Sequence, residues 1–126
     1  MSAALFKLKP IEKVELVPGH LVKEIIMKGT GESPVKGNTV TAHYTGVLTN
    51  GEKFDSSRDR GKPFQFKIGI GQVIQSWDVG MLSMKVGERA VLTSSSEYAY
   101  GEDGAPPVIP PNANLVFDVE LIKISK

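Results

Sequence analysis

The fold of this 126-residue chain is decided by residues 38–55, which read NTVTAHYTGVLTNGEKFD. Apolar and polar side chains alternate along the first part, and one side of it carries Val40, Ala42 and Tyr44. This period of two predicts a half-buried strand over residues 38–49. Asn50-Gly51 is a strong signal for a hairpin turn, so we expect residues 52–55 to return antiparallel to that strand.

The segments on either side extend this pattern. Alternating or β-rich stretches bounded by turn residues predict further strands over 21–27, 64–68, 89–95 and 115–124. Only Val73–Leu82 has apolar residues at spacings of three and four, which predicts one short helix. The sum is an α+β fold, in which a curled antiparallel sheet has one short helix covering its apolar face.

The length and the turn residues indicate one domain. Pro10 and Pro18 interrupt residues 1–18, which we expect to form a loosely held N-terminal arm, followed by a domain over 19–126. A long loop over 98–114 holds four prolines.

The composition excludes several classes of function. The 15 basic and 14 acidic residues are interleaved, so we expect no nucleic-acid partner. The start lacks the apolar run of a signal peptide, and no stretch approaches the ~20 apolar residues of a membrane span, so we expect no membrane partner. The chain has no cysteine, which excludes disulfides and permits a reducing compartment. A cytoplasmic location is expected, and a nuclear one is equally compatible.

The aromatic residues point to a binding pocket. Eight of the nine fall between residues 44 and 117, each beside a turn or chain reversal. Rings in such places suit an aromatic-walled pocket at the mouth of a small β-structure, where tyrosine hydroxyls add polar contacts. We therefore predict a pocket for an apolar ligand. The eight residues are Tyr44, Phe54, Phe64, Phe66, Trp77, Tyr98, Tyr100 and Phe117.

Several other motifs have a simple structural interpretation. Gly69-Ile70-Gly71 lacks the third glycine and the βαβ setting of a dinucleotide fingerprint. His20 and His43 are too far apart for local metal-ligand spacing, and His43 is interpreted as a surface histidine, so neither a metal nor a cofactor is expected. The polar run 56–60 is either a solvated loop or part of the site. Trp77 is either a core residue or the floor of the pocket.

Four motifs together carry a family resemblance. They read YTGVLTNGEKFDSSRDRGKPFQF (44–66), VIQSWDVGM (73–81), YAYG (98–101) and VIPPNANLVFDVEL (108–121). In this order they closely resemble the FKBP family, the FK506-binding proteins, which are peptidyl-prolyl cis-trans isomerases. The resemblance covers about residues 20–124. It implies a curled antiparallel sheet of five to six strands wrapped around one short helix.

The resemblance also implies a site. The catalytic residues would be Tyr44, Phe54, Asp55, Trp77, Tyr100 and Phe117, with Trp77 as the pocket floor. The hydroxyl of Tyr100 and the backbone N–H of Ile74 would each bind a ligand carbonyl, and Arg60 would pair near Asp55. The wider ligand-binding set adds Arg60, Phe64, Gln72, Val73, Ile74, Val108 and Ile109. The segment 102–107 is the variable part of the rim.

The implied activity is rotation of X–Pro peptide bonds in proline-containing peptides and proteins, with no cofactor. The same pocket would bind macrolide inhibitors of the FK506 and rapamycin type, and the isolated domain would be a monomer. The alternative is a non-catalytic docking or chaperone module that uses the pocket and its rim. The client protein and the preferred residue before proline do not follow from the sequence.

Overall fold

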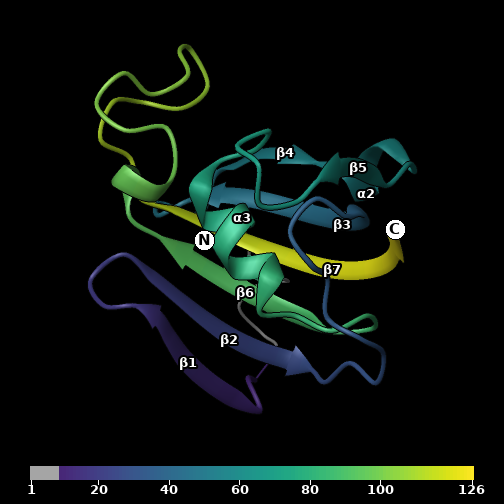
Figure 1. Ribbon diagram of the computed structural model, residues 1–126. Coiled ribbons are helices and arrows are strands. Elements are labelled where there is room, and N and C mark those ends of the chain that lie inside the picture. Colours follow the sequence, from purple (N-terminus) through teal and green to yellow (C-terminus); the bar gives the residue numbers. More distant parts are fainter. Residues whose placement is uncertain (1–8) are drawn as a thin grey trace.

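The computed structural model describes residues 9–126, and their dominant feature is one antiparallel sheet (Figure 1). Its seven strands are β1 (Glu12–Val17), β2 (Leu21–Met27), β3 (Thr39–Leu48), β4 (Lys53–Ser56), β5 (Phe64–Lys67), β6 (Arg89–Ser94) and β7 (Leu115–Ser125). The helices are α2 (Ser57–Arg60), α3 (Gln75–Leu82) and the 3₁₀ turn η1 (Ser96–Tyr98).

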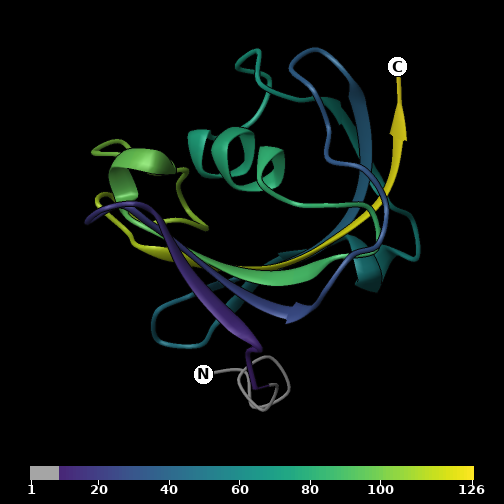
Figure 2. The same ribbon diagram turned by 60° about the horizontal axis from the view of Figure 1, so that its bottom comes forward.

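The strand order explains how distant segments meet. The sheet runs β1-β2-β6-β7-β3-β4, and β5 pairs with β3. The long strand β7 lies between β6 and β3, so Phe117 is opposite both Leu92 and Gly46. Figure 2 shows the sheet curving around α3, which lies on its concave side. The predicted α+β fold is therefore confirmed.

The core fills the space between α3 and the concave face of the sheet. Alternate residues of β7 point into it, because successive side chains of a strand face opposite sides. From α3, Trp77 and Met81 pack against the sheet residues. The buried strand residues of this cluster include Leu21, Val40, Ala42, Leu92, Leu115, Phe117, Val119 and Leu121.

The N-terminal prediction needs a correction. Residues 12–17, expected to lie in a loose arm, form strand β1, which pairs with β2 from Glu12 opposite Ile25 to Val17 opposite Leu21. The alternation of Lys13 and Glu15 with Val14 and Leu16 is that of an edge strand with one wet face. The sheet thus has seven strands where five to six were expected. Residues 1–8 of the expected arm lie outside the described residues.

The helices also differ from expectation in detail. The helix predicted over 73–82 begins at Gln75. The polar run after β4 forms the four-residue helix α2, in which the Ser56 hydroxyl accepts a hydrogen bond from the N–H of Asp59, and Gly61 at φ +67° ends it. None of the helices within residues 9–126 is long and apolar enough to cross a membrane.

Candidate active site

One cavity of about 420 Å³ opens beside the start of α3. Its walls come from β3, β4, β5, β7, the loop before α3 and the loop after η1. Every residue that lines it belongs to the set predicted from the sequence. The lining residues are Tyr44, Phe54, Asp55, Phe64, Gln72, Val73, Ile74, Trp77, Tyr100 and Phe117.

Trp77 forms the floor of this cavity. It is only 6% exposed, and its ring lies edge-on to Tyr44 (4.7 Å between ring centroids) and Phe117 (5.3 Å). Edge-to-face contacts of this kind fix ring orientation more tightly than apolar burial alone. The two interpretations of Trp77 therefore hold together, since it is a core residue whose free face closes the pocket.

The wall formed by Phe54 and Phe117 depends on a residue that sequence reasoning missed. Their rings meet edge-on at 5.8 Å between centroids. A Cβ added to Gly46 would lie 2.5 Å from Cζ of Phe54 and 2.9 Å from Cε1 of Phe117. Only a glycine at position 46 lets both rings lie close to the backbone of β3. Its sequence signal, a glycine inside a strand pattern, usually marks such a close approach.

A polar network of three residues closes one side of the cavity. The Tyr44 hydroxyl donates to Oδ2 of Asp55 (2.5 Å) and accepts from Nη2 of Arg60 (3.0 Å), while Nη1 of Arg60 donates to Oδ1 of Asp55. Burial acts to raise the pKa of Asp55, but the hydrogen bonds from Tyr44 and Arg60 outweigh it and the pKa lies below its ordinary value. Asp55 is therefore ionised at neutral pH, and each of its oxygens already accepts a hydrogen bond from a side chain.

The two tyrosines of the cavity differ in their hydrogen bonding. Burial, with the hydrogen bond to Asp55, raises the pKa of Tyr44. Burial and the nearby Asp55 charge raise the pKa of Tyr100, whose hydroxyl has no hydrogen-bond partner among residues 9–126. Tyr100 is 41% exposed. It therefore presents a protonated hydroxyl, able to donate a hydrogen bond, at the mouth of the cavity.

The start of α3 provides backbone donors beside the cavity, which Val73 and Ile74 line. Ile74 is the N-cap residue of α3, and no side chain caps this end. The first N–H groups of a helix lack partners within the helix. The preceding loop is held by Asp78, whose carboxylate accepts from the N–H groups of Gly69 (2.8 Å) and Gly71 (3.0 Å). This anchor was not predicted, and it places Val73 and Ile74 at the cavity.

Three residues of the predicted ligand-binding set do not line the cavity, and neither do Phe66 and Tyr98 of the eight aromatic residues. Val108 is exposed on the rim loop, and Ile109 is buried in the core cluster next to it, where its N–H and carbonyl pair with Ala105. Arg60 reaches the site only through Asp55 and Tyr44. The side chain of Gln72 does line the cavity, but its Oε1 accepts from the N–H of Lys67.

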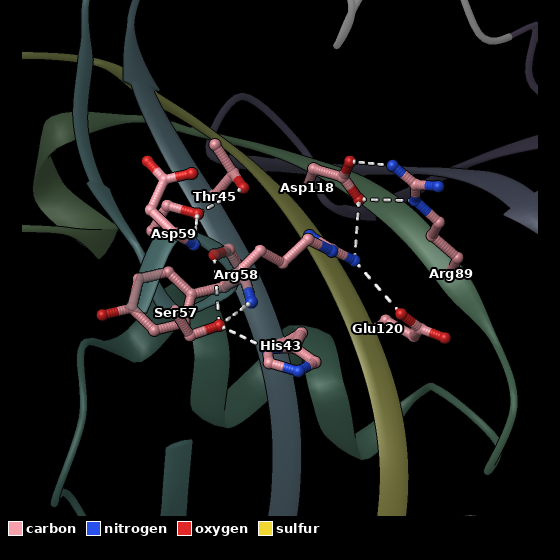
Figure 3. A network of polar contacts seen from close by, with 10 residues as sticks. His43, Thr45, Ser57, Arg58, Asp59, Arg89, Asp118 and Glu120 are labelled. Atoms are coloured by element: carbon pink, nitrogen blue, oxygen red, sulfur yellow. Dashed lines mark hydrogen bonds and ion pairs between the residues drawn. The ribbon is translucent and has the colours of Figure 1, made fainter. Parts of the chain in front are cut away.

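Helix α2 is held in place by buried polar contacts (Figure 3). The Ser57 hydroxyl is fully buried, accepts from the N–H of Tyr44 (2.8 Å) and pairs with Nδ1 of His43 (2.9 Å). His43 is thus a half-buried structural residue, where a surface histidine was expected. Within residues 9–126, no group of three His, Cys, Asp or Glu side chains could hold a metal ion.

An ion-pair network also holds α2, through Arg58. Asp118 of β7 is buried and accepts from Nε (3.0 Å) and Nη2 (2.6 Å) of Arg89 on β6. Arg58 of α2 donates to Glu120 (3.2 Å) and lies 4.0 Å from Asp118. Figure 3 shows these side chains bridging β6, β7 and α2. Because α2 is tied down in this way, Arg60 at its end is positioned to reach Asp55.

Comparisons with known proteins agree with this geometry. The sequence profile of the family described as FKBP-type peptidyl-prolyl cis-trans isomerase matches residues 30–122. The chain is 54% identical over 112 residues to FK506-binding protein 1 of Saccharomyces cerevisiae, covering 88% of this chain and 98% of that protein. It is 56% identical over 108 residues to FK506-binding protein 1 of Yarrowia lipolytica (85% and 99%).

A third relative has a name that states an activity. The peptidyl-prolyl cis-trans isomerase of Schizosaccharomyces pombe is 53% identical over 104 residues, covering 82% of this chain and 93% of that protein. The matched residues 30–122 include every residue that lines the aromatic cavity. The chain belongs to the FKBP-type peptidyl-prolyl cis-trans isomerase family.

Proposed function

We propose that this chain catalyses cis-trans rotation of X–Pro bonds, with the proline ring held in the aromatic cavity over Trp77. The observation that carries the proposal is the cavity itself. Its walls are mostly aromatic and apolar, its volume of about 420 Å³ has room for a proline ring and its neighbours, and donors stand at Tyr100 and at the start of α3.

The reaction makes and breaks no covalent bond, so the site needs no nucleophile. The barrier of about 18–20 kcal/mol comes from amide resonance, which is lost when the bond is twisted. A site accelerates rotation if it binds the twisted amide better than the planar one. Resonance places charge on the amide oxygen and nitrogen of the planar form, and water stabilises that charge. An aromatic pocket removes this water, which disfavours the planar form more than the twisted one.

The polar residues are assigned separate roles. The hydroxyl of Tyr100 donates a hydrogen bond to one client carbonyl, and the backbone N–H of Ile74 donates one to another. The peptide is thereby fixed on both sides of the proline. Asp55 contributes local electrostatics and orients Tyr44. It is not a general base, because its carboxylate is already bonded to Tyr44 and Arg60 and its pKa is lowered.

The partners proposed are proline-containing peptides and proteins, together with macrolides of the FK506 and rapamycin type. Two relatives are named for FK506 binding, which supports the macrolide part. We further propose that the chain acts as a monomer in the cytoplasm. Sedimentation of the purified chain and imaging of a tagged copy test these two points.

The test is the cis-to-trans rate of a short Leu-Pro peptide, with and without FK506. We expect fast turnover that FK506 suppresses. A Tyr100→Phe variant should lower kcat/KM by about three- to tenfold, because it loses one hydrogen bond worth about 0.5–1.5 kcal/mol. The matched control is Tyr98→Phe, since Tyr98 stacks on His20 outside the cavity and should leave the rate unchanged.

Two other results would contradict the proposal. Acceleration that survives in a Phe54→Ala, Tyr100→Ala double variant would place the activity elsewhere. Tight FK506 binding without acceleration of any Leu-Pro or Phe-Pro peptide would favour the docking-module alternative over catalysis.

A further inference from the structure

A second cavity adjoins the aromatic one and has a different chemistry. Its volume is about 530 Å³, and its lining residues are Arg60, Lys62, Pro63, Phe64 and Gln65. Phe64 lines both cavities, so the two lie next to each other at this ring. Two of the five lining residues are cationic and none is acidic.

The charges around this second cavity do not cancel. Arg60 is paired with Asp55, and the nearby Lys53 is paired with Asp59. Lys62 is exposed, and its ammonium group has no ion-pair partner among residues 9–126. The cavity therefore has an uncompensated positive charge at Lys62.

The guanidinium of Arg60 also has N–H groups that neither Asp55 nor Tyr44 uses. A guanidinium has five N–H groups. Arg60 uses one for Asp55 and one for the Tyr44 hydroxyl. The others are open to an anion that enters beside Lys62. A carboxylate or phosphate oxygen matches such donors well, because charge-assisted hydrogen bonds are the stronger ones.

The far side of the aromatic cavity has the opposite charge. Glu102 and Asp103 follow Tyr100, are exposed and have no ion-pair partner within the described part of the chain. Figures 1 and 2 place this loop on one side of α3 and the β5–α2 side on the other. An anionic client residue would be repelled at the loop and attracted at Lys62, which orients the client along the cavity.

We propose that the second cavity is a subsite for an anionic side chain of the client, held by Lys62 with Arg60, within a few residues of the bound proline. This rests on the proposed isomerase function and adds a substrate class to it: acidic or phosphorylated segments next to X–Pro bonds. Lys62 acts as a specificity residue and takes no part in the rotation.

The experiment compares Leu-Pro peptides that differ only in their flanks. One is neutral, two carry glutamate one to three residues before or after the Leu-Pro pair, and matching peptides carry phosphoserine. We expect one placement of the anion to raise kcat/KM over the neutral peptide about two- to fivefold at low ionic strength, the range of an exposed ion pair. About 0.5 M salt should bring this ratio close to one.

The variants locate the effect. Lys62→Gln should remove the preference and Lys62→Glu should reverse it, with the neutral peptide as internal reference in each variant. Among residues 9–126, the one hydrogen bond of Lys62 runs from its backbone N–H to the carbonyl of Ser57, so the substitutions leave α2 intact. The matched control is Lys67→Gln, an exposed lysine on β5 outside both cavities, which should keep the preference.

Each remaining outcome has a distinct meaning. Equal rates for all peptides in the wild type would overturn the subsite and leave the isomerase function standing. A preference that survives in Lys62→Gln would overturn the assignment to this cavity. If no peptide is accelerated, the proposed function falls and the subsite with it. Phosphoserine peptides that exceed the glutamate ones would assign the subsite to phosphorylated clients, and the reverse order would assign it to carboxylates.

Discussion

Under the proposed function, Asp55 serves the site as an ionised carboxylate and takes no proton. Its hydrogen bonds to Tyr44 and Arg60 hold its pKa below the ordinary value. Asp55→Ala should therefore lower kcat/KM by less than about tenfold, the effect of one or two hydrogen bonds. A loss as complete as that of a Phe54→Ala, Tyr100→Ala double variant would contradict this assignment. Peptide isomerisation rates measure the effect.

The same shift predicts a pH dependence of stability. A carboxyl group whose pKa is lower in the folded state stabilises the fold above its ordinary pKa, and that contribution is lost as the pH falls through the folded value. For Asp55 this stabilising contribution is lost below about pH 4, and no change in stability from Asp55 is expected between pH 5 and 8. In Asp55→Asn, the free energy of unfolding measured with urea should fall less steeply as the pH is lowered. A slope below about pH 4 that is the same in both proteins would contradict the shift.

Gly46 and Gly80 offer a matched pair of substitutions. A Cβ at Gly46 would clash with Phe54 and Phe117, whereas one at Gly80 would lie 2.7 Å from Cδ1 of Leu92, away from the cavity. Both alanine variants should lose about 1–3 kcal/mol of unfolding free energy, as overpacked cores do. Only Gly46→Ala should also raise the Kd for FK506, because it displaces the rings of Phe54 and Phe117 from the cavity wall. Each 1.4 kcal/mol of binding free energy lost in this way raises the Kd about tenfold. Equal affinities in the two variants would contradict this difference.

At the scale of the elements, the loop before α3 depends on Asp78, a side chain that does not line the cavity. Asp78→Ala removes the acceptor for Gly69 and Gly71, whose N–H groups are partly open to water. We expect a loss of about 1–2 kcal/mol of stability, since water replaces part of each bond. The kcat/KM should fall as well, because Val73 and Ile74 follow this loop. Asp103→Ala, with no hydrogen-bond partner among residues 9–126, is the stability control.

Local sequence patterns predicted most elements but not all of their ends. Strand β2 was predicted at both ends, because its apolar run is bounded by glycines on either side. The helix was predicted to start at Val73, since Val73 and Ile74 fit its spacing, yet both belong to the loop that Asp78 holds. Strand β1 was missed because alternating charges also suit a solvated arm.

The candidate site divides in the same way. The positions of the aromatic residues beside turns predicted a pocket, and the family resemblance assigned roles to these residues. The residues that support them gave no comparable signal. Gly46, Ser57 and Asp78 act through contacts with groups 7 to 71 positions away along the chain, so their contribution appears only once the chain is folded.

At the scale of the whole molecule, the sheet separates the N-terminal strand from the site. β1 is the outer neighbour of β2, whereas the cavity takes residues from β3, β4, β5 and β7. Deleting residues 1–17 should therefore cost about 2 kcal/mol or more, from backbone hydrogen bonds worth about 0.5–1.5 kcal/mol each and the packing of Leu16. Isomerisation should stay within about twofold of the full chain. A cavity that no longer binds FK506 in the deletion variant would contradict this separation.

The place of β7 has a consequence for biosynthesis. β7 is the last strand in the sequence, yet it lies between β6 and β3 near the middle of the sheet. A nascent chain therefore exposes two unpaired strand edges until residues 115–125 leave the ribosome, and exposed edges are where chains stick to one another. The sheet therefore cannot be completed before residues 115–125 have emerged, and during that interval the chain itself requires the protection given to newly made proteins.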